Sequence, residues 1–368
     1  MVSEANKVKL SAVGDIMLGD LPACFGFGVG SKIKQYGPHF PFSMIMDTLT
    51  DNDILLGNLE SVLSNRQMNK WWLPTLYMRG DPRAVNTLIN CGFKVLSVSN
   101  NHMMQHGAEA FRDTVNILKS NGICPIGLKS GSQFNSKPYI TEIKGIRLGF
   151  LGYSLRPEEY RPTEVLYCHA NENTIIEDIH RIREDVDFVI ISLHWGDEYV
   201  QRPSPNQIAM ARRLINEGAD IILGHHPHVL QGIENYEGGL IAYSLGNFIF
   251  DMWMSETRKS IVLEILISEK GIDDFRIIPL MISERYQPYI LNGKEKCYFH
   301  SHFDNLCRYL RDSNCSDKDY HKDLLECFNR YRKSVIQHYK KNIFRYSFFY
   351  LLQLLIILFI RRFLKKHI

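Results

Sequence analysis

Short apolar runs rich in β-branched residues recur between residues 8 and 285, and amphipathic stretches and polar turns separate them. Such runs, bounded by Gly, Pro or polar residues, are typical of buried strands. The pattern predicts strands at residues 8–18, 53–59, 95–99, 139–153, 187–193, 220–223, 240–244, 260–267 and 275–282. It predicts helices at residues 108–120, 174–184 and 205–217. Strands that alternate with helices indicate an α/β fold.

The composition is that of a folded globular chain. Of 368 residues, 45% are hydrophobic and 23% are charged, which excludes a disordered or collagen-like chain. The 43 Lys and Arg residues nearly balance the 40 Asp and Glu residues, so we expect no nucleic acid partner. The eight cysteines form no Cys-x-x-Cys pair, and we expect them to be reduced.

The C-terminal region carries an uncharged apolar run, residues 346–360. As a helix this run extends roughly 22 Å, short of the roughly 30 Å hydrocarbon core of a bilayer. Basic side chains on both sides could reach the headgroups and extend the effective length: Lys340, Lys341, Arg345, Arg361, Arg362, Lys365 and Lys366. We therefore expect a membrane anchor. The alternative is a buried C-terminal helix.

The sequence predicts three parts in this chain. Residues 1–290 carry the α/β pattern, residues 291–341 form a charged helical extension, and residues 342–368 form the anchor. We expect one helix at 317–341 that continues into the apolar run. The N-terminal residues show no secretory signal, so the simplest topology attaches the protein to the membrane through its C-terminus and keeps the main domain in the cytoplasm.

Polar side chains follow five of the predicted strands, at the point where each strand ends. In open α/β sheets the carboxyl ends of the strands form the ligand crevice, so these side chains should converge. Imidazole nitrogens mixed with carboxylate oxygens suit divalent metal ions of intermediate softness. The candidate ligands, numerous enough for two ions, are Asp15, Glu60, Asn101, His194, His226 and His228.

Six motifs in this order carry a family resemblance: GDIMLGD at 14–20, GNLES at 57–61, SNNH at 99–102, HWGDEY at 194–199, GHHPHVLQ at 224–231 and SLGNFIFD at 244–251. Together they resemble the CapA capsule-synthesis family. CapA proteins are in turn similar to the calcineurin-like metallophosphoesterases. The resemblance implies a four-layer αββα sandwich with a dinuclear centre of divalent ions, such as Mn, Fe or Zn, at the strand ends.

The resemblance also implies a role for each candidate. Asp15 and His228 would bind the first metal, and Glu60 would bridge the two ions. Asn101, His194 and His226 would bind the second metal, and His102 would stand beside them as the proton donor to a leaving group. A His102 imidazole suits this role because its ordinary pKa lies near neutrality.

This chain departs from the ordinary phosphoesterase pattern at two positions. Met17 stands where a histidine is usual, so we expect the first metal to be weakly held. Asn58 stands where that pattern has an aspartate, so we expect Glu60 to take the role of that aspartate. We leave His225 out of the site, because its side chain should point away if those of His226 and His228 point in.

Two further residues are candidates for binding substrate. Arg79 could hold an anionic group of the substrate, although a single arginine at a turn can also be a solvated charge. Asn247 follows another strand and could either line the pocket or cap the turn.

Three functions are compatible with these features. The first is synthesis or export of capsular poly-γ-glutamate at the membrane, together with other capsule-synthesis proteins. The second is hydrolysis of a different phosphoester, since a fold and a metal centre do not fix the substrate. The third is a non-catalytic role in assembly or polymer binding, which the Met17 departure motivates.

Overall fold

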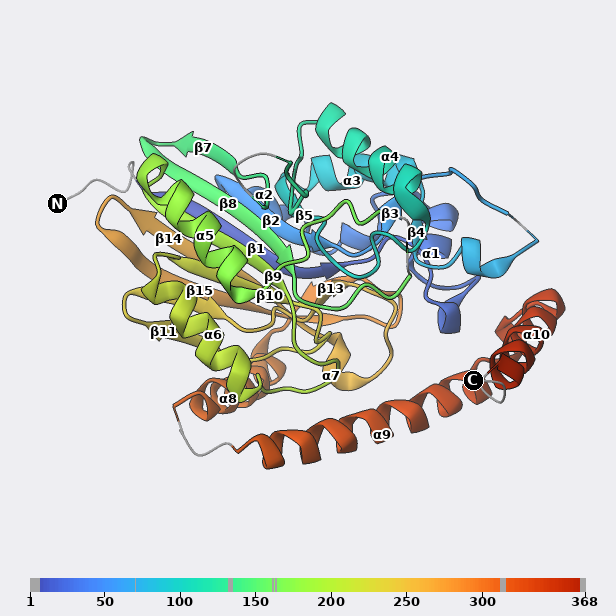
Figure 1. Ribbon diagram of the computed structural model, residues 1–368. Coiled ribbons are helices and arrows are strands. Elements are labelled where there is room, and N and C mark those ends of the chain that lie inside the picture. Colours follow the sequence, from blue (N-terminus) through green and yellow to red (C-terminus); the bar gives the residue numbers. More distant parts are fainter. Residues whose placement is uncertain are drawn as a thin grey trace.

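The computed structural model describes residues 7–364, except residues 70, 132–134, 161, 163 and 312–315. Two large sheets dominate this part of the chain (Figure 1). Along the first sheet the strands follow the order β16 (Pro288–Ile290), β15 (Gly271–Ile282), β14 (Lys259–Ser268), β1 (Val8–Ile16), β2 (Ile54–Leu59), β5 (Phe93–Ser97) and β6 (Cys124–Ile126). A short strand, β13 (Asn247–Ile249), also pairs with β1.

In the described part of the chain the second sheet has six strands. Its order is β11 (Ile233–Tyr236), β12 (Gly239–Ala242), β10 (Ile221–His225), β9 (Phe188–His194), β8 (Ile146–Ser154) and β7 (Tyr139–Ile143). Strands β8, β9 and β10 are parallel, as are β1, β2 and β5 in the first sheet. A separate small pair joins β3 (Val62–Leu63) to β4 (Arg79–Gly80).

The two sheets pack face to face because apolar side chains alternate along their strands. In β1, Val8, Leu10 and Ala12 point into the core between the sheets, where they meet side chains of β8 and β9 such as Phe150 and Ile190. The alternate residues of β9, at positions 189, 191 and 193, belong to a different core on the outer face. Strands β1 and β9 therefore each contribute to two apolar layers, as the period of two residues requires.

Helices cover both outer faces. On the first sheet lie α1 (Val29–Tyr36), α2 (Met46–Thr50), α3 (Val85–Asn90) and α4 (Gly107–Ser120). On the second lie α5 (Glu172–Ile182) and α6 (Pro205–Asn216) (Figure 1). The start of α6 has a capping box, in which Ser204 and Gln207 satisfy each other's backbone N–H groups. The expected α/β architecture is confirmed.

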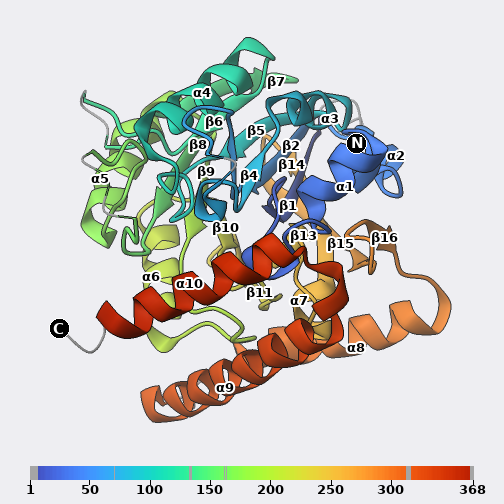
Figure 2. The same ribbon diagram turned by 90° about the vertical axis from the view of Figure 1, so that its right-hand side faces the viewer.

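The C-terminal helices pack along the sandwich. In α8 (Gly293–Tyr309), Phe299 and Phe303 enter the core between the sheets. Helix α9 (Asp317–Lys341) follows, and α10 (Phe348–Leu364) then turns back across the domain (Figure 2). The described residues contain no helix that is both long and apolar enough to cross a membrane. The three-part division of the chain stays a prediction.

The helix expected to continue from α9 into the apolar run is interrupted. Asn342 ends α9, and its Nδ2 atom donates to the carbonyl oxygen of His338 at 2.9 Å. A short 3-10 turn, Ile343–Arg345, and the extended residue Tyr346 follow. The Ser347 hydroxyl then accepts from the backbone N–H of Tyr350 in the first turn of α10. Side-chain capping thus creates a break that apolar periodicity alone did not predict.

Candidate metal centre

Strands from both sheets end beside one another and bring the candidate ligands together. In register, Asp15 of β1 lies opposite Asn58 of β2, and His194 of β9 lies opposite His225 of β10. Asn58 joins the two sheets, because its Nδ2 atom donates to Asp15 Oδ1 at 2.9 Å and lies 3.4 Å from His194 Nδ1. The sequence-based expectation of convergence at the strand ends therefore describes the geometry well.

Glu60 occupies the centre of the group. It is fully buried, and neither carboxylate oxygen has a hydrogen-bond partner among the described residues. Its Oε1 atom lies 3.7 Å from His102 Nε2 and 3.8 Å from the Nε2 atoms of His194 and His228. Burial, and then the neighbouring Asp15 carboxylate, raise the pKa of Glu60 well above its ordinary value. A buried carboxylate without partners is costly, and a bound cation would offset that cost.

Asp15 is surrounded by imidazoles. Its Oδ1 atom lies 3.2 Å from His225 Nδ1, and its Oδ2 atom lies 3.3 Å from His228 Nδ1. Burial alone would raise the pKa of Asp15, but hydrogen bonding to these two histidines holds it well below its ordinary value. The side chain of His225 therefore faces Asp15, contrary to the expectation that it points away.

Asn101 and His194 present their side chains to the same point. Asn101 Oδ1 lies 2.9 Å from His194 Nε2, while Asn101 Nδ2 donates to Glu159 Oε1 at 3.2 Å. Two adjacent ligand atoms at about 2.1 Å from one octahedrally coordinated divalent ion lie about 3 Å apart, so this spacing suits two ligands of one ion. Burial lowers the pKa of His194 well below its ordinary value, which keeps the imidazole in the neutral form that binds metal.

The turn that carries His226 and His228 has a strained backbone. Their φ angles are 96° and 57°, in the left-handed region that residues other than glycine rarely adopt. Both nitrogens of His226 lack a hydrogen-bond partner among the described residues, and its ring lies 4.7 Å from that of His194. Burial, and then the neighbouring imidazoles, lower the pKa of His226 well below its ordinary value.

In the part of the chain that the structure describes, three overlapping groups of residues have ligand atoms within 4.8 Å of one another. One group is Asp15, Glu60 and His228, and a second is Glu60, His194 and His226. These groups contain five of the six ligands predicted from the sequence, with Glu60 common to both. The third group is Glu198, His226 and His228. Sequence reasoning missed Glu198, although it lies inside the HWGDEY motif.

His102 is positioned by its own neighbours. Its Nδ1 atom lies 3.2 Å from Gln105 Oε1 and 3.1 Å from the Tyr160 hydroxyl. Because an amide oxygen can only accept, Nδ1 carries the proton in this arrangement, and Nε2 faces Glu60. Burial lowers the pKa of His102 to about 4.

The Met17 side chain is buried among apolar residues. Its sulfur accepts a contact from the backbone N–H of Gly19 at 3.1 Å, and its side chain packs in an apolar cluster with Met78, Tyr199 and Phe250. A thioether held in this way is a poor ligand for a hard divalent ion, as expected from the sequence.

The two predicted substrate residues lie in different surroundings. Asn247 is fully buried, and its Oδ1 atom lies 2.9 Å from His228 Nδ1, while its Nδ2 atom donates to the carbonyl of Thr257. This geometry favours a role for Asn247 in orienting the His228 imidazole. Arg79 donates to the carbonyls of Ser64 and Arg66, and it lines a cavity of about 1080 Å³ beside the small β3–β4 pair.

A model of the family described as bacterial capsule synthesis protein PGA_cap matches residues 9–252. The chain belongs to this family. All six quoted motifs lie within the match, so the resemblance read from the sequence is confirmed. The chain is 30% identical over 296 residues to the capsule biosynthesis protein CapA of Bacillus anthracis, which covers 76% of this chain and 69% of CapA.

Other capsule synthesis family members are also similar. The PGA biosynthesis protein CapA of Bacillus subtilis is 30% identical over 278 residues, covering 74% of this chain and 71% of that protein.

Among solved structures, a 5′-nucleotidase of Candida albicans gives a TM-score of 0.41 at 12% identity, covering 89% of this chain and 58% of the other. A Thermus thermophilus protein gives 0.48 at 14% identity, covering 74% and 98%. These structural scores are too low to support an argument about function.

Proposed function

We propose that this protein acts in the synthesis or export of capsular poly-γ-glutamate, through a metallophosphoesterase-type domain with a two-metal centre. Family membership and the names of its two CapA relatives, a capsule biosynthesis protein and a PGA biosynthesis protein, support the pathway. The four layers of helices, sheet, sheet and helices are consistent with a domain of that type.

The observation that carries this proposal is the isolated Glu60 carboxylate, which faces the Nε2 atoms of three histidines. Asp15, Glu60 and His228 would hold the first ion. Glu60, His194 and His226 would hold the second, with the Asn101 oxygen as a further ligand. Two divalent ions held there would lower the pKa of a water and stabilise the charge that develops during phosphoester hydrolysis.

His102 would move the proton in this reaction. Gln105 and Tyr160 orient its ring so that Nε2 faces the site, where it would give a proton to the departing oxygen. With a pKa of about 4, the imidazole is neutral near pH 7 in the arrangement described. A negatively charged phosphoester bound beside it would raise that pKa and favour the protonated form.

The substrate would be anionic. Arg79 is 8% exposed, and its Nε atom has no hydrogen-bond partner among the described residues. Lys34 and Arg83 line the same cavity of about 1080 Å³, as do Asp20 and Asp81, and Asp81 forms an ion pair with Arg83 at 2.7 Å. Arg79 and Lys34 would therefore make the contacts with the carboxylates or phosphates of the substrate.

A non-catalytic role in polymer binding or assembly is the second candidate, and the buried, inward-turned sulfur of Met17 favours it. Purified protein distinguishes the two. Bound divalent metal together with turnover of a generic phosphoester such as bis-p-nitrophenyl phosphate supports the enzyme. Protein that binds polyglutamate but neither holds metal nor hydrolyses a phosphoester supports the second candidate.

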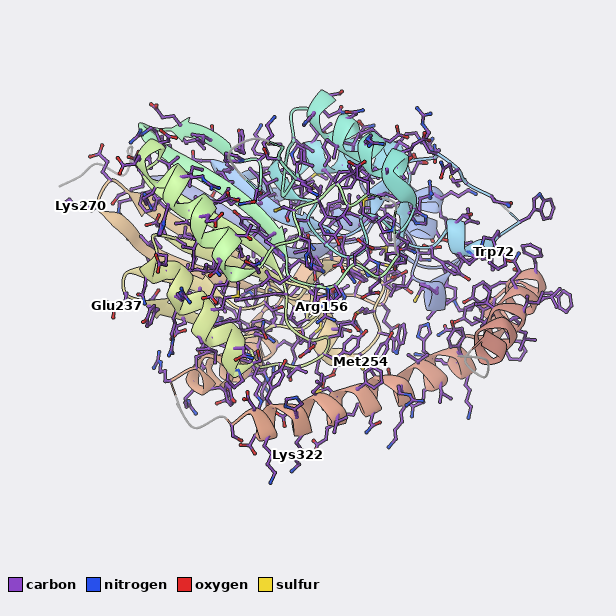
Figure 3. The ribbon with its side chains drawn as sticks, viewed as in Figure 1. Trp72, Arg156, Glu237, Met254, Lys270 and Lys322 are labelled. Carbon is purple, nitrogen blue, oxygen red and sulfur yellow. The ribbon has the colours of Figure 1, made fainter. Side chains whose placement is uncertain are left out.

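Membrane attachment through the C-terminal segment is also part of the proposal. Helix α10 docks on the domain through Tyr350 and Gln353, and Gln353 Nε2 donates to the carbonyl of Trp71 at 2.7 Å. Figure 3 labels Trp72 beside this helix. Among the side chains that the structure describes, the exposed apolar ones on and beside α10 include Trp71, Trp72, Ile343, Phe344, Phe348, Phe349, Leu352, Leu355 and Ile356. The nearby exposed Lys340, Lys341 and Arg345 suit anionic headgroups.

A further inference from the structure

Glu198 lies on the loop that follows β9, outside the ligand set that the sequence predicted. One of its carboxylate oxygens, one nitrogen of His226 and one nitrogen of His228 lie within 4.8 Å of one another. Of these three, the two histidines are buried, and Glu198 is partly exposed.

Three separate contacts fix the loop that carries Glu198. The backbone N–H of Tyr199 donates to the carbonyl of Pro227 at 2.8 Å, which ties the loop to the turn between the two histidines. The Tyr199 ring stacks on Tyr331 of α9 with a centroid separation of 4.2 Å. On the other side of Glu198, Asp197 accepts from the Tyr320 hydroxyl of α9 at 2.9 Å.

The backbone around this group is strained on both segments. Tyr199, directly after Glu198, has a φ angle of 69°, and His226 and His228 also lie in the left-handed region. Such conformations are costly for residues other than glycine and persist only where the surrounding structure holds them. Here the strain sets the direction of the segments that carry all three potential ligands.

The proposed site of the first metal lacks a ligand at position 17, where Met17 stands in place of a histidine. The group Asp15, Glu60 and His228 lacks the imidazole that a histidine at position 17 would supply, and the Met17 sulfur accepts from the backbone N–H of Gly19. A carboxylate is a better ligand than a thioether for a hard or intermediate divalent ion. Glu198 reaches His228 from the side of the HWGDEY loop and offers such a carboxylate.

We propose that Glu198 is a further metal ligand of this centre, which binds the ion held by His228 and compensates for Met17. The inference rests on the proposed two-metal function and adds a residue to it. It also assigns a role to α9, since Tyr320 and Tyr331 of the charged extension hold the loop that presents this ligand.

The test compares full-length wild type with E198Q and with E237Q, a control that removes an exposed carboxylate from the turn between β11 and β12. Metal-free protein is titrated with Mn²⁺ alone, and the stoichiometry and dissociation constants are measured by calorimetry. We expect two sites in wild type and in E237Q. In E198Q we expect the weaker site to lose at least about 10-fold in affinity.

Thermal unfolding with and without Mn²⁺ provides a second measurement, together with E198D. We expect the metal-induced rise in melting temperature to be smaller in E198Q than in E198D, and smaller in both than in wild type. Two unchanged sites and an unchanged rise in E198Q would overturn the inference while leaving the proposed function intact. Absence of Mn²⁺ binding by wild type would overturn both.

Discussion

Asn247 and His228 form a buried pair in which Asn247 Oδ1 lies 2.9 Å from His228 Nδ1. Because the amide oxygen accepts, Nδ1 carries a proton in this contact, and Nε2 faces Glu60, 3.8 Å away. Asn247 therefore sets both the orientation and the tautomer of a candidate ligand, in the way that outer partners of metal-bound histidines commonly do.

Removal of this acceptor should weaken metal binding. For N247L, which keeps the approximate size of the side chain, we expect divalent metal affinity to fall about 10- to 100-fold. N247D keeps an oxygen acceptor and should lose less. Metal titration of the two variants checks this. Equal metal affinity in N247L and wild type would show that His228 needs no such orientation.

His102 should affect proton transfer more than metal binding. We expect H102A to keep the wild-type metal content but to hydrolyse phosphoesters about 10² to 10⁴ times more slowly. Substrates with very acidic leaving groups should be affected least, because their departing oxygen needs no proton. Steady-state kinetics on a series of aryl phosphodiesters measures this. An equal loss on all leaving groups would contradict the role.

His106 should make stability depend on pH independently of any metal. Burial lowers its pKa to about 4, and its Nε2 donates to the carbonyl of Tyr77 at 2.8 Å. The folded protein therefore prefers neutral His106, whereas in the unfolded chain the imidazole has a pKa of 6.5. Above pH 6.5 the imidazole is neutral in both states, and the folded state loses stability as the pH falls from 6.5 toward 4.

The variant H106Q keeps a donor for Tyr77 but does not titrate. Between pH 6.5 and pH 4, wild type should lose up to about 3 kcal/mol of unfolding free energy relative to H106Q. Urea unfolding of metal-free protein at several pH values gives this difference. Parallel curves for the two proteins would contradict the assignment.

The exposed face of α10 should carry membrane attachment. Phe348 is 82% exposed and Leu355 is 65% exposed, so replacing them should not unfold the protein. We expect F348E/L355E to lose at least about 10-fold in binding to vesicles that contain anionic lipid, because burial of each large apolar side chain contributes about 1.5 to 3 kcal/mol. The matched control is Y298E on α8, where the side chain is 75% exposed.

Vesicle co-sedimentation at low and high salt measures this attachment. The double variant should stay in the supernatant, and Y298E should sediment with wild type. Equal sedimentation of all three proteins would rule out α10 as the attachment surface. Truncation is a less clean test, since Tyr346 and Tyr350 pack against Cys24, Phe27 and Tyr77, and their removal would expose that apolar cluster.

The residues at the strand ends could be predicted from sequence, because a polar residue directly after a buried apolar run marks the end of a strand. Apolar runs locate the strands, and the polar residue after each run lies at the edge where parallel strands finish, as Asp15 and His194 do. Motif order then identified the family. Much of the fold and most of the proposed ligand set follow from these two kinds of information.

The remaining features depend on backbone geometry that has no sequence period. Alternation predicted that His225 points away from the site, but the left-handed backbone at His226 breaks the alternation, and His225 faces Asp15. Glu198 lies on a loop, where no spacing rule applies. Asn247 could be placed at a strand end, but only the structure gives its partner, His228.

The metal content of the purified protein tests the central claim most directly. Elemental analysis of wild type should find two divalent ions per chain, and H194A or H226A should each reduce that content, because their imidazoles belong to the candidate ligand groups around Glu60 and Glu198. Wild-type protein that holds no divalent metal after purification and after addition of Mn²⁺, Fe²⁺ or Zn²⁺ would contradict the account.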